Sequence, residues 1–265
     1  MPADKTDVPL RATGWRSVFV SHRGALRNTN EDSFLEAPDL GLWAIADGMG
    51  GHEAGQMASA MIVHALEQVP PLSSGEGTEA CVRERVEAAN DRLQVLSREV
   101  FGGRTIGSTI AVLILRPEWV CCLWAGDSRI YRLRGGTLQR LTRDHSRTED
   151  LIAQGVIAPE QAESHPQANV ITRAVGATSN LVLDSRIEPL DAADRFLLCT
   201  DGLYRSVAEH EMASVLTRAD WDAANELLAL SLSRDPTDNV TLGIVQSDLD
   251  VTQSPNRHAL ESKPL

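Results

Sequence analysis

Alternating and continuous apolar runs along the chain predict a series of β-strands separated by turn residues. The predicted strands cover residues 17–22, 33–36, 42–46, 109–115, 119–125, 130–134, 181–187, 195–200 and 240–246. Apolar residues that recur every three or four positions predict helices over 53–67, 78–100 and 221–231, and further helices over 147–154 and 209–217.

The order of these elements predicts the fold class. Strands come first, two long helices follow, and a series of short strands precedes the last helix and strand, which is not the strict alternation of a parallel sheet. We therefore expect an α+β fold, a sandwich of two antiparallel sheets flanked by helical layers. Polar composition at both ends predicts a flexible arm over 1–14, one catalytic domain over 15–247 and a flexible tail over 248–265.

Composition and charge narrow the class of protein. Apolar residues make up 42% of the chain, which is enough for a substantial core, and the formal net charge is −12. Nucleic acid and anionic membrane are not expected partners, because there is no lysine- or arginine-rich run. The four cysteines form no Cys-x-x-Cys pair. With no apolar leader and no run long enough to span a bilayer, the cytoplasm is the expected location.

Aspartates adjoin four of the most apolar predicted strands. Asp47, Asp127 and Asp201 come directly after or soon after such strands, and Asp238 precedes the last one. An Asp-Gly pair taken alone predicts a hairpin turn, because both residues tolerate positive φ. Two features favour a site instead. Residues 47–51 hold more glycine than a turn needs and lead into a helix, and the strands are too apolar for a sheet surface.

If these strands are neighbours, their carboxylates converge at one edge and need a cation to remain ionised together. Oxygen ligands favour Mg²⁺, Mn²⁺ or Ca²⁺ over zinc or copper. Gly48 could turn its carbonyl toward the same ion, since it has no side chain in the way. Upstream, Arg27 precedes the polar segment 28–32; it is either a solvated loop arginine or a planar donor suited to a phosphate dianion.

Other common catalytic motifs are absent from the sequence. Residues 48–55 miss the G-x-G-x-x-G spacing, and there is no G-x-S-x-G, no G-x-x-x-x-G-K-[ST] and no H-E-x-x-H. A serine hydrolase, a P-loop nucleotidase and a zinc protease would each need one of these.

From about residue 21 to 245 the chain resembles the metal-dependent protein phosphatases, the type 2C serine/threonine phosphatases, in their bacterial form. The matching segments stand in the order of that family. They are Arg27-x-x-Asn30-Glu31-Asp32, 47–52 (DGMGGH), 107–109 (GST), 126–129 (GDSR), 141–146 (LTRDHS), 169–176 (NVITRAVG), 200–203 (TDGL) and Asp238-Asn239. The resemblance implies two antiparallel sheets packed face to face, with helical pairs outside.

The resemblance also implies roles for particular residues. Asp47 would bridge two Mn²⁺ or Mg²⁺ ions, Gly48 would offer its carbonyl to one of them, and Asp201 and Asp238 would bind the other. Arg27 would clamp the phosphoryl group of the substrate. These residues form the expected catalytic set.

Three further acidic residues complete the implied site. Glu31 and Asp32 would orient metal-bound waters, and Asp127 would help to hold a weaker third ion with Asp201 as a shared ligand. Residues from about 144 to 175 would form a flap beside the site that influences substrate access.

The implied reaction is hydrolysis of phosphoserine and phosphothreonine on proteins by in-line attack of a water that bridges the two ions. We expect the protein to be a monomer that opposes a bacterial serine/threonine kinase. Some members of the family carry a histidine after the Asp-Gly pair as a general acid. Here that position is Met49, and nearby His52 is expected to begin the following helix.

Two other functions fit parts of this pattern. A catalytically silent phosphoprotein-binding regulator would have lost an aspartate ligand, but Asp47, Asp201 and Asp238 are all present. A non-catalytic Ca²⁺-binding module would carry a spaced D-x-D-x-D loop, which the sequence lacks.

Overall fold

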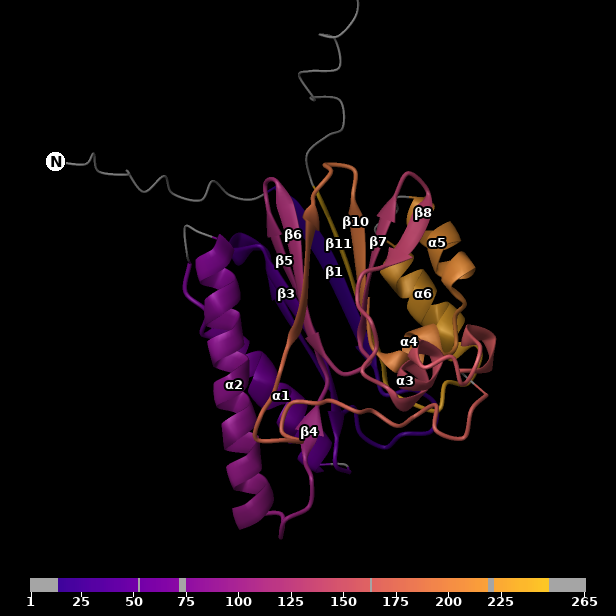
Figure 1. Cartoon of the computed structure of the whole chain (residues 1–265). Coiled ribbons are helices and arrows are strands. Elements are labelled where there is room, and N and C mark those ends of the chain that lie inside the picture. Colours follow the sequence, from indigo (N-terminus) through magenta and orange to yellow (C-terminus); the bar gives the residue numbers. More distant parts are fainter. Residues whose placement is uncertain (1–13, 52, 72–74, 163, 219–221, 248–265) are drawn as a thin grey trace, which may run out of the picture.

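The computed structural model describes residues 14–51, 53–71, 75–162, 164–218 and 222–247. Two antiparallel sheets lie face to face with helices on both outer faces, which confirms the predicted α+β sandwich (Figure 1). Apart from Gly14, the predicted arm and tail lie outside the described residues. None of the described helices has the length and apolarity needed to cross a membrane.

The first sheet combines both ends of the described chain. Its strand order is β1 (Trp15–His22), β11 (Val240–Ser247), β10 (Arg195–Cys199), β7 (Arg129–Arg134) and β8 (Thr137–Arg140). The second sheet has the order β2 (Asp32–Ala37), β3 (Leu42–Met49), β5 (Ile110–Arg116), β6 (Trp119–Ala125) and β9 (Asp184–Pro189), and the short β4 (Gly107–Ser108) pairs with the end of β3.

Helices cover the outer face of each sheet (Figure 1). The second sheet is covered by α1 (Glu53–Glu67) and α2 (Gly75–Glu99). The first is covered by α4 (Asp201–Tyr204), α5 (Glu209–Thr217) and α6 (Ala223–Leu232). The segment between β8 and β9 carries α3 (Arg147–Ala153) and a 3₁₀ turn (Pro159–Gln161), and a second 3₁₀ turn (Pro38–Leu40) joins β2 to β3.

Apolar residues from both sheets form the central core. Trp43 and Leu113 of the second sheet and Phe196 and Val245 of the first belong to one fully buried cluster. Burial of each such side chain stabilises the fold by roughly 1.5–3 kcal/mol. Because the central strands are buried on both faces, β3, β5, β6, β10 and β11 appear in the sequence as nearly continuous apolar runs.

The structure corrects several predicted boundaries. The strand predicted to end at residue 46 continues through Asp47 to Met49, because its end pairs with β4. Strands β4 and β8 and the short helix α4 were not predicted, since each is too short for a periodic pattern. The strand predicted from residue 181 begins only at Asp184.

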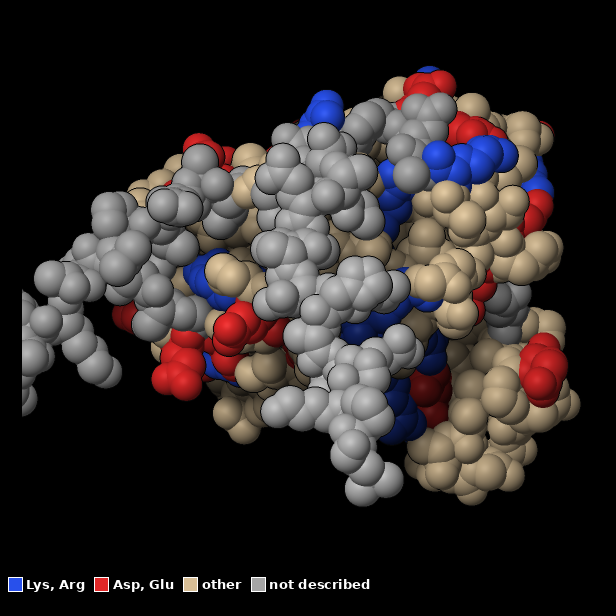
Figure 2. Space-filling model, turned by 90° about the horizontal axis from the view of Figure 1, so that it is seen from above, with Lys and Arg blue, Asp and Glu red and all other residues tan. Residues whose placement is uncertain are grey.

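The two ends of the sandwich differ in chemistry. At the end away from Asp47, arginine and acidic side chains are interspersed, as Figure 2 shows from above. Arg134 at the β7–β8 hairpin pairs there with buried Asp194 at 2.5 Å. At the other end, carboxylates gather around a cleft.

Candidate metal centre and active-site cleft

A cleft of about 320 Å³ opens where β3, β10 and β11 meet the loops at one end of the sandwich. Seven of the eight predicted site residues line it: Arg27, Glu31, Asp47, Gly48, Asp127, Asp201 and Asp238. Asn169 and Ile171 of the predicted flap also line it, as do Met49, Arg205 and Asn239. The remaining predicted residue, Asp32, lies buried behind this wall.

Asp32 and Asp47 come from neighbouring strands. They are directly opposite each other in the β2–β3 pair. Burial raises the pKa of Asp32 to about 7, although Thr241 and Thr200 oppose this shift by donating hydrogen bonds to its Oδ2 at 2.6 and 3.0 Å. The pKa of Asp47 is raised well above its ordinary value by burial and then by the charge of Asp32.

A second pair of carboxylates, Asp127 and Asp201, also lines the cleft. Asp201 is the first residue of α4, directly after β10, and Asp127 follows β6. Burial, and next the charge of Asp201, raises the pKa of Asp127 to about 7. The Tyr204 hydroxyl donates to Asp127 Oδ2 at 3.3 Å, and Arg205 Nε lies 3.0 Å from Asp201 Oδ2.

Arg27 stands at the mouth of the cleft in an ion pair with Asp238. Its Nη2 lies 2.6 Å from Asp238 Oδ2. Asn239 fixes the loop that carries the arginine, since its Oδ1 accepts from the Glu31 amide at 2.8 Å and its Nδ2 donates to the carbonyls of Arg23 and Thr29. Both members of the Asp238-Asn239 motif therefore act on the same loop.

Two glycines allow strand β3, helix α1 and Glu31 to approach closely. A Cβ on Gly48 would lie 2.1 Å from the carbonyl oxygen of Gly55, and a Cβ on Gly55 would lie 1.9 Å from Glu31 Oε2. Real Cβ atoms do not come so near, so a side chain at Gly48 would meet backbone, and one at Gly55 would displace the Glu31 carboxylate. The Glu31 carboxylate is therefore seated against the first turn of α1.

The donors in this cleft fit divalent cations. Among the residues that the structure describes, no three carboxylate, histidine or cysteine side chains are gathered as the ligands of one ion. Within the same residues, Asp32 Oδ1 and Asp201 Oδ1 are buried without a hydrogen-bond partner, which leaves strong acceptors for a cation. The oxygen atoms of these mutually repelling carboxylates are ligands that suit Mn²⁺ or Mg²⁺.

His145 ties the predicted flap segment to the turn that carries Asp127. Its Nδ1 accepts from the Gly126 amide at 3.1 Å, and its Nε2 lies 3.1 Å from Asp184 Oδ2. The backbone of His145 also accepts from Thr172, near the far end of the flap. Burial lowers the pKa of His145, which is consistent with a neutral ring whose Nδ1 accepts a hydrogen bond.

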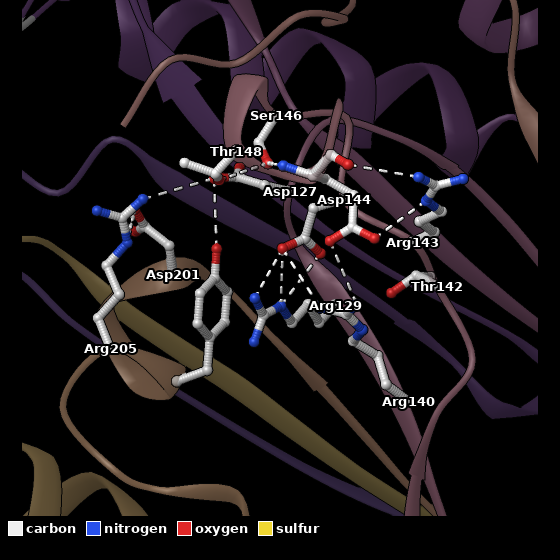
Figure 3. A network of polar contacts seen from close by, with 12 residues as sticks. Asp127, Arg129, Arg140, Thr142, Arg143, Asp144, Ser146, Thr148, Asp201 and Arg205 are labelled. Atoms are coloured by element: carbon white, nitrogen blue, oxygen red, sulfur yellow. Dashed lines mark hydrogen bonds and ion pairs between the residues drawn. The ribbon is translucent and has the colours of Figure 1, made fainter. Parts of the chain in front are cut away.

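Sequence reasoning missed several residues of this site. Arg205, Thr200 and Thr241 contact the acidic residues directly, and Figure 3 shows Arg205 beside Asp201 and Asp127. Arg205 could have been found from its place four residues after Asp201, once a helix there is known. The two threonines gave no such signal. His52, which is expected to begin the helix after residues 47–51, lies outside the described residues.

The chain is similar to proteins of one known family. The family model described as protein phosphatase 2C matches residues 24–230. The serine/threonine phosphatase stp of Listeria welshimeri is 32% identical over 240 residues, covering 87% of this chain and 95% of the relative. The structure described as PppA, a key regulatory component of T6SS in Pseudomonas aeruginosa, has a TM-score of 0.82 and 39% identity, covering 89% of this chain and 99% of that one.

One similar structure contains metal ions. The catalytic domain of the serine/threonine protein phosphatase PstP in complex with two manganese ions has a TM-score of 0.77 and 29% identity, and the match covers 88% of this chain and 97% of that one. The chain belongs to the protein phosphatase 2C family. It is a metal-dependent serine/threonine protein phosphatase, and the silent-regulator alternative is not favoured.

Proposed function

We propose that the cleft is the active site and that two Mn²⁺ or Mg²⁺ ions occupy it. Asp47 and the Gly48 carbonyl, with Asp201 and Asp238, would hold this pair, and Asp127 would share Asp201 with a weaker third ion. The observation that carries the proposal is the burial of mutually repelling carboxylates, which raises the pKa values of Asp47, Asp127 and Asp201. Two manganese ions in the PstP relative support the same number here.

The bound ions would supply an activated water and would offset negative charge on the phosphoryl oxygens. The chain's own residues position the reactants. Arg27 offers a planar fork for the phosphate dianion, as its place at the cleft mouth supports. Thr200 and Thr241 orient the Asp32 carboxylate, and Asn239 holds Glu31, so both acids are fixed before substrate arrives.

The substrates would be proteins that carry phosphoserine or phosphothreonine, supplied by a serine/threonine kinase that the phosphatase opposes. The names of the relatives support this class of substrate. We further propose that the enzyme is a cytoplasmic monomer and that residues 144–175 form a flap beside the cleft. The position of Asn169 and Ile171 in the cleft wall supports the flap.

The test compares phosphate release from p-nitrophenyl phosphate and from a phosphothreonine peptide, in Mn²⁺ and in EDTA. We expect turnover only with the metal. Asp47→Asn should reduce it by about a hundredfold or more, since a metal contributes several kcal/mol. Asp39→Asn, an exposed aspartate at the opposite end of the sandwich, is the matched control and should retain activity. Absence of Mn²⁺-dependent release from both substrates would reject the proposal.

A further inference from the structure

Arg205 of the turn after α4 contacts both the buried acidic pair and the flap. Its Nε lies 3.0 Å from Asp201 Oδ2, and its Nη2 lies 3.8 Å from Asp127 Oδ2. On the other side its Nη1 donates to Asn169 Oδ1, and its Nη2 donates to the Ala168 carbonyl at 3.4 Å. One guanidinium therefore joins two candidate metal ligands to two consecutive flap residues.

The same side chain stands between two cavities. Besides the cleft, a second cavity of about 290 Å³ lies under the flap. Its wall includes Arg129, Tyr204, Ser146, Thr148 and Ala168, and it shares Asp127 and Arg205 with the cleft. Figure 3 shows Arg205 directed toward Asp127 and Asp201, with Ser146 and Thr148 nearby. Movement of the Arg205 side chain would therefore change the wall that separates the two cavities.

Charge makes the position of Arg205 conditional. The side-chain oxygens that it contacts, Asp201 Oδ2 and Asp127 Oδ2, belong to the same two carboxylates that would bind a cation there. A guanidinium and a divalent ion a few ångströms apart repel each other strongly in a half-buried site, where water screens their charges less than in bulk solution. The guanidinium and a divalent ion therefore compete for this pair.

We propose that Arg205 is a positioning residue that ties residues 168–169 of the flap to the Asp127–Asp201 pair, and that a divalent cation bound by this pair displaces it and releases the flap. The second half rests on the proposed cation site, whereas the first half does not depend on any metal. The structure supports the tie through four separate polar contacts of a single side chain.

The first experiment measures hydrogen exchange of the flap in EDTA. The amides of Ala168 and Val170 are hydrogen-bonded within the flap and serve as reporters. In Arg205→Ala they should exchange about tenfold faster or more, because hydrogen bonds from a charged group stabilise more than neutral ones and the variant removes them. Arg205→Lys keeps the charge without the fork and should give an intermediate rate. Equal rates in the wild type and Arg205→Ala would overturn the tie.

The second experiment adds Mn²⁺ and follows the same two amides. In the wild type, exchange of these amides should accelerate once the most weakly bound ion occupies its site. Calorimetric titration gives the Mn²⁺ concentration at which this ion binds. Asp127→Asn should abolish this acceleration, and Arg205→Ala should bind the weakest ion about tenfold more tightly because its competitor is gone. Acceleration that persists in Asp127→Asn, or weaker binding in Arg205→Ala, would overturn the competition. Loss of Mn²⁺-dependent turnover in the wild type would instead reject the phosphatase site, and the EDTA comparison is independent of that outcome.

Discussion

Asp32 and Asp47 face each other directly across the β2–β3 pair, with Asp47 in the wall of the acidic cleft and Asp32 buried behind it. Like charges in opposed positions of a sheet destabilise it. Thr200 and Thr241 hold the Asp32 carboxylate by hydrogen bonds, and a cation in the proposed site would offset the charges. We therefore expect these carboxylates to oppose folding when no metal is bound.

The metal-free protein should lose stability as pH rises. Burial raises the pKa of Asp32 from 3.8 to about 7 in the folded state, so between these values the folded chain binds more protons than the unfolded chain. The free energy of unfolding then falls with increasing pH across this range. The pKa of Asp127, also about 7, acts in the same direction. Denaturant unfolding in EDTA at about pH 5 and about pH 8 measures the slope.

Asp32→Asn is the control for this pH effect, because it removes one titrating carboxyl and keeps its shape. Its stability should change less with pH than that of the wild type. A wild-type protein that becomes more stable from pH 5 to pH 8 in EDTA would contradict the assigned shift.

Arg27 should act mainly on substrate binding. In the structure it pairs with Asp238, and in the complex it would turn its fork to the phosphate. Arg27→Ala should raise the KM for a phosphothreonine peptide by roughly 10- to 100-fold, the worth of one or two charge-assisted hydrogen bonds. Arg27→Lys should recover part of the loss. Steady-state kinetics decide the matter: a fall in kcat with unchanged KM would place the role of Arg27 in the transition state.

His145 should stabilise the turn that carries Asp127. His145→Ala would leave the Gly126 amide without its acceptor, at a cost of about 1–3 kcal/mol, or on the order of 5 °C in the melting temperature. His145→Asn places an acceptor oxygen near the position of Nδ1 and should lose less. Thermal unfolding of both variants in EDTA tests this, and equal losses would show that packing against Trp124 accounts for the effect instead.

Gly55→Ala should destabilise the protein although it replaces glycine within a helix. Alanine normally stabilises a helix by about 1 kcal/mol relative to glycine. Here the added methyl group would meet Glu31 Oε2 at 1.9 Å and displace the carboxylate. In a Glu31→Ala background the same substitution should lose most of its cost. A double-mutant cycle by chemical denaturation measures this coupling, and additive effects would refute the contact.

Much of the fold could be predicted because burial determines periodicity. The boundaries of α1 and α5 match their predicted ranges, since an amphipathic or buried helix shows its period directly. Strand β4 could not be predicted, because two residues carry no period and its formation depends on pairing with Gly48 and Met49. The same pairing extends β3 beyond the apolar run that ends at Ala46.

By itself, the sequence identified the candidate residues for the chemistry: aspartates beside apolar strands, an arginine upstream and glycine after Asp47. Local patterns record burial and turn preference, so they identify strands and their polar neighbours. The tertiary structure alone decided that Asp32 opposes Asp47, that Thr200 and Thr241 hold Asp32, and that Arg205 joins Asp201 to Asn169. These relationships depend on strand register and on contacts between distant segments, which no local pattern encodes.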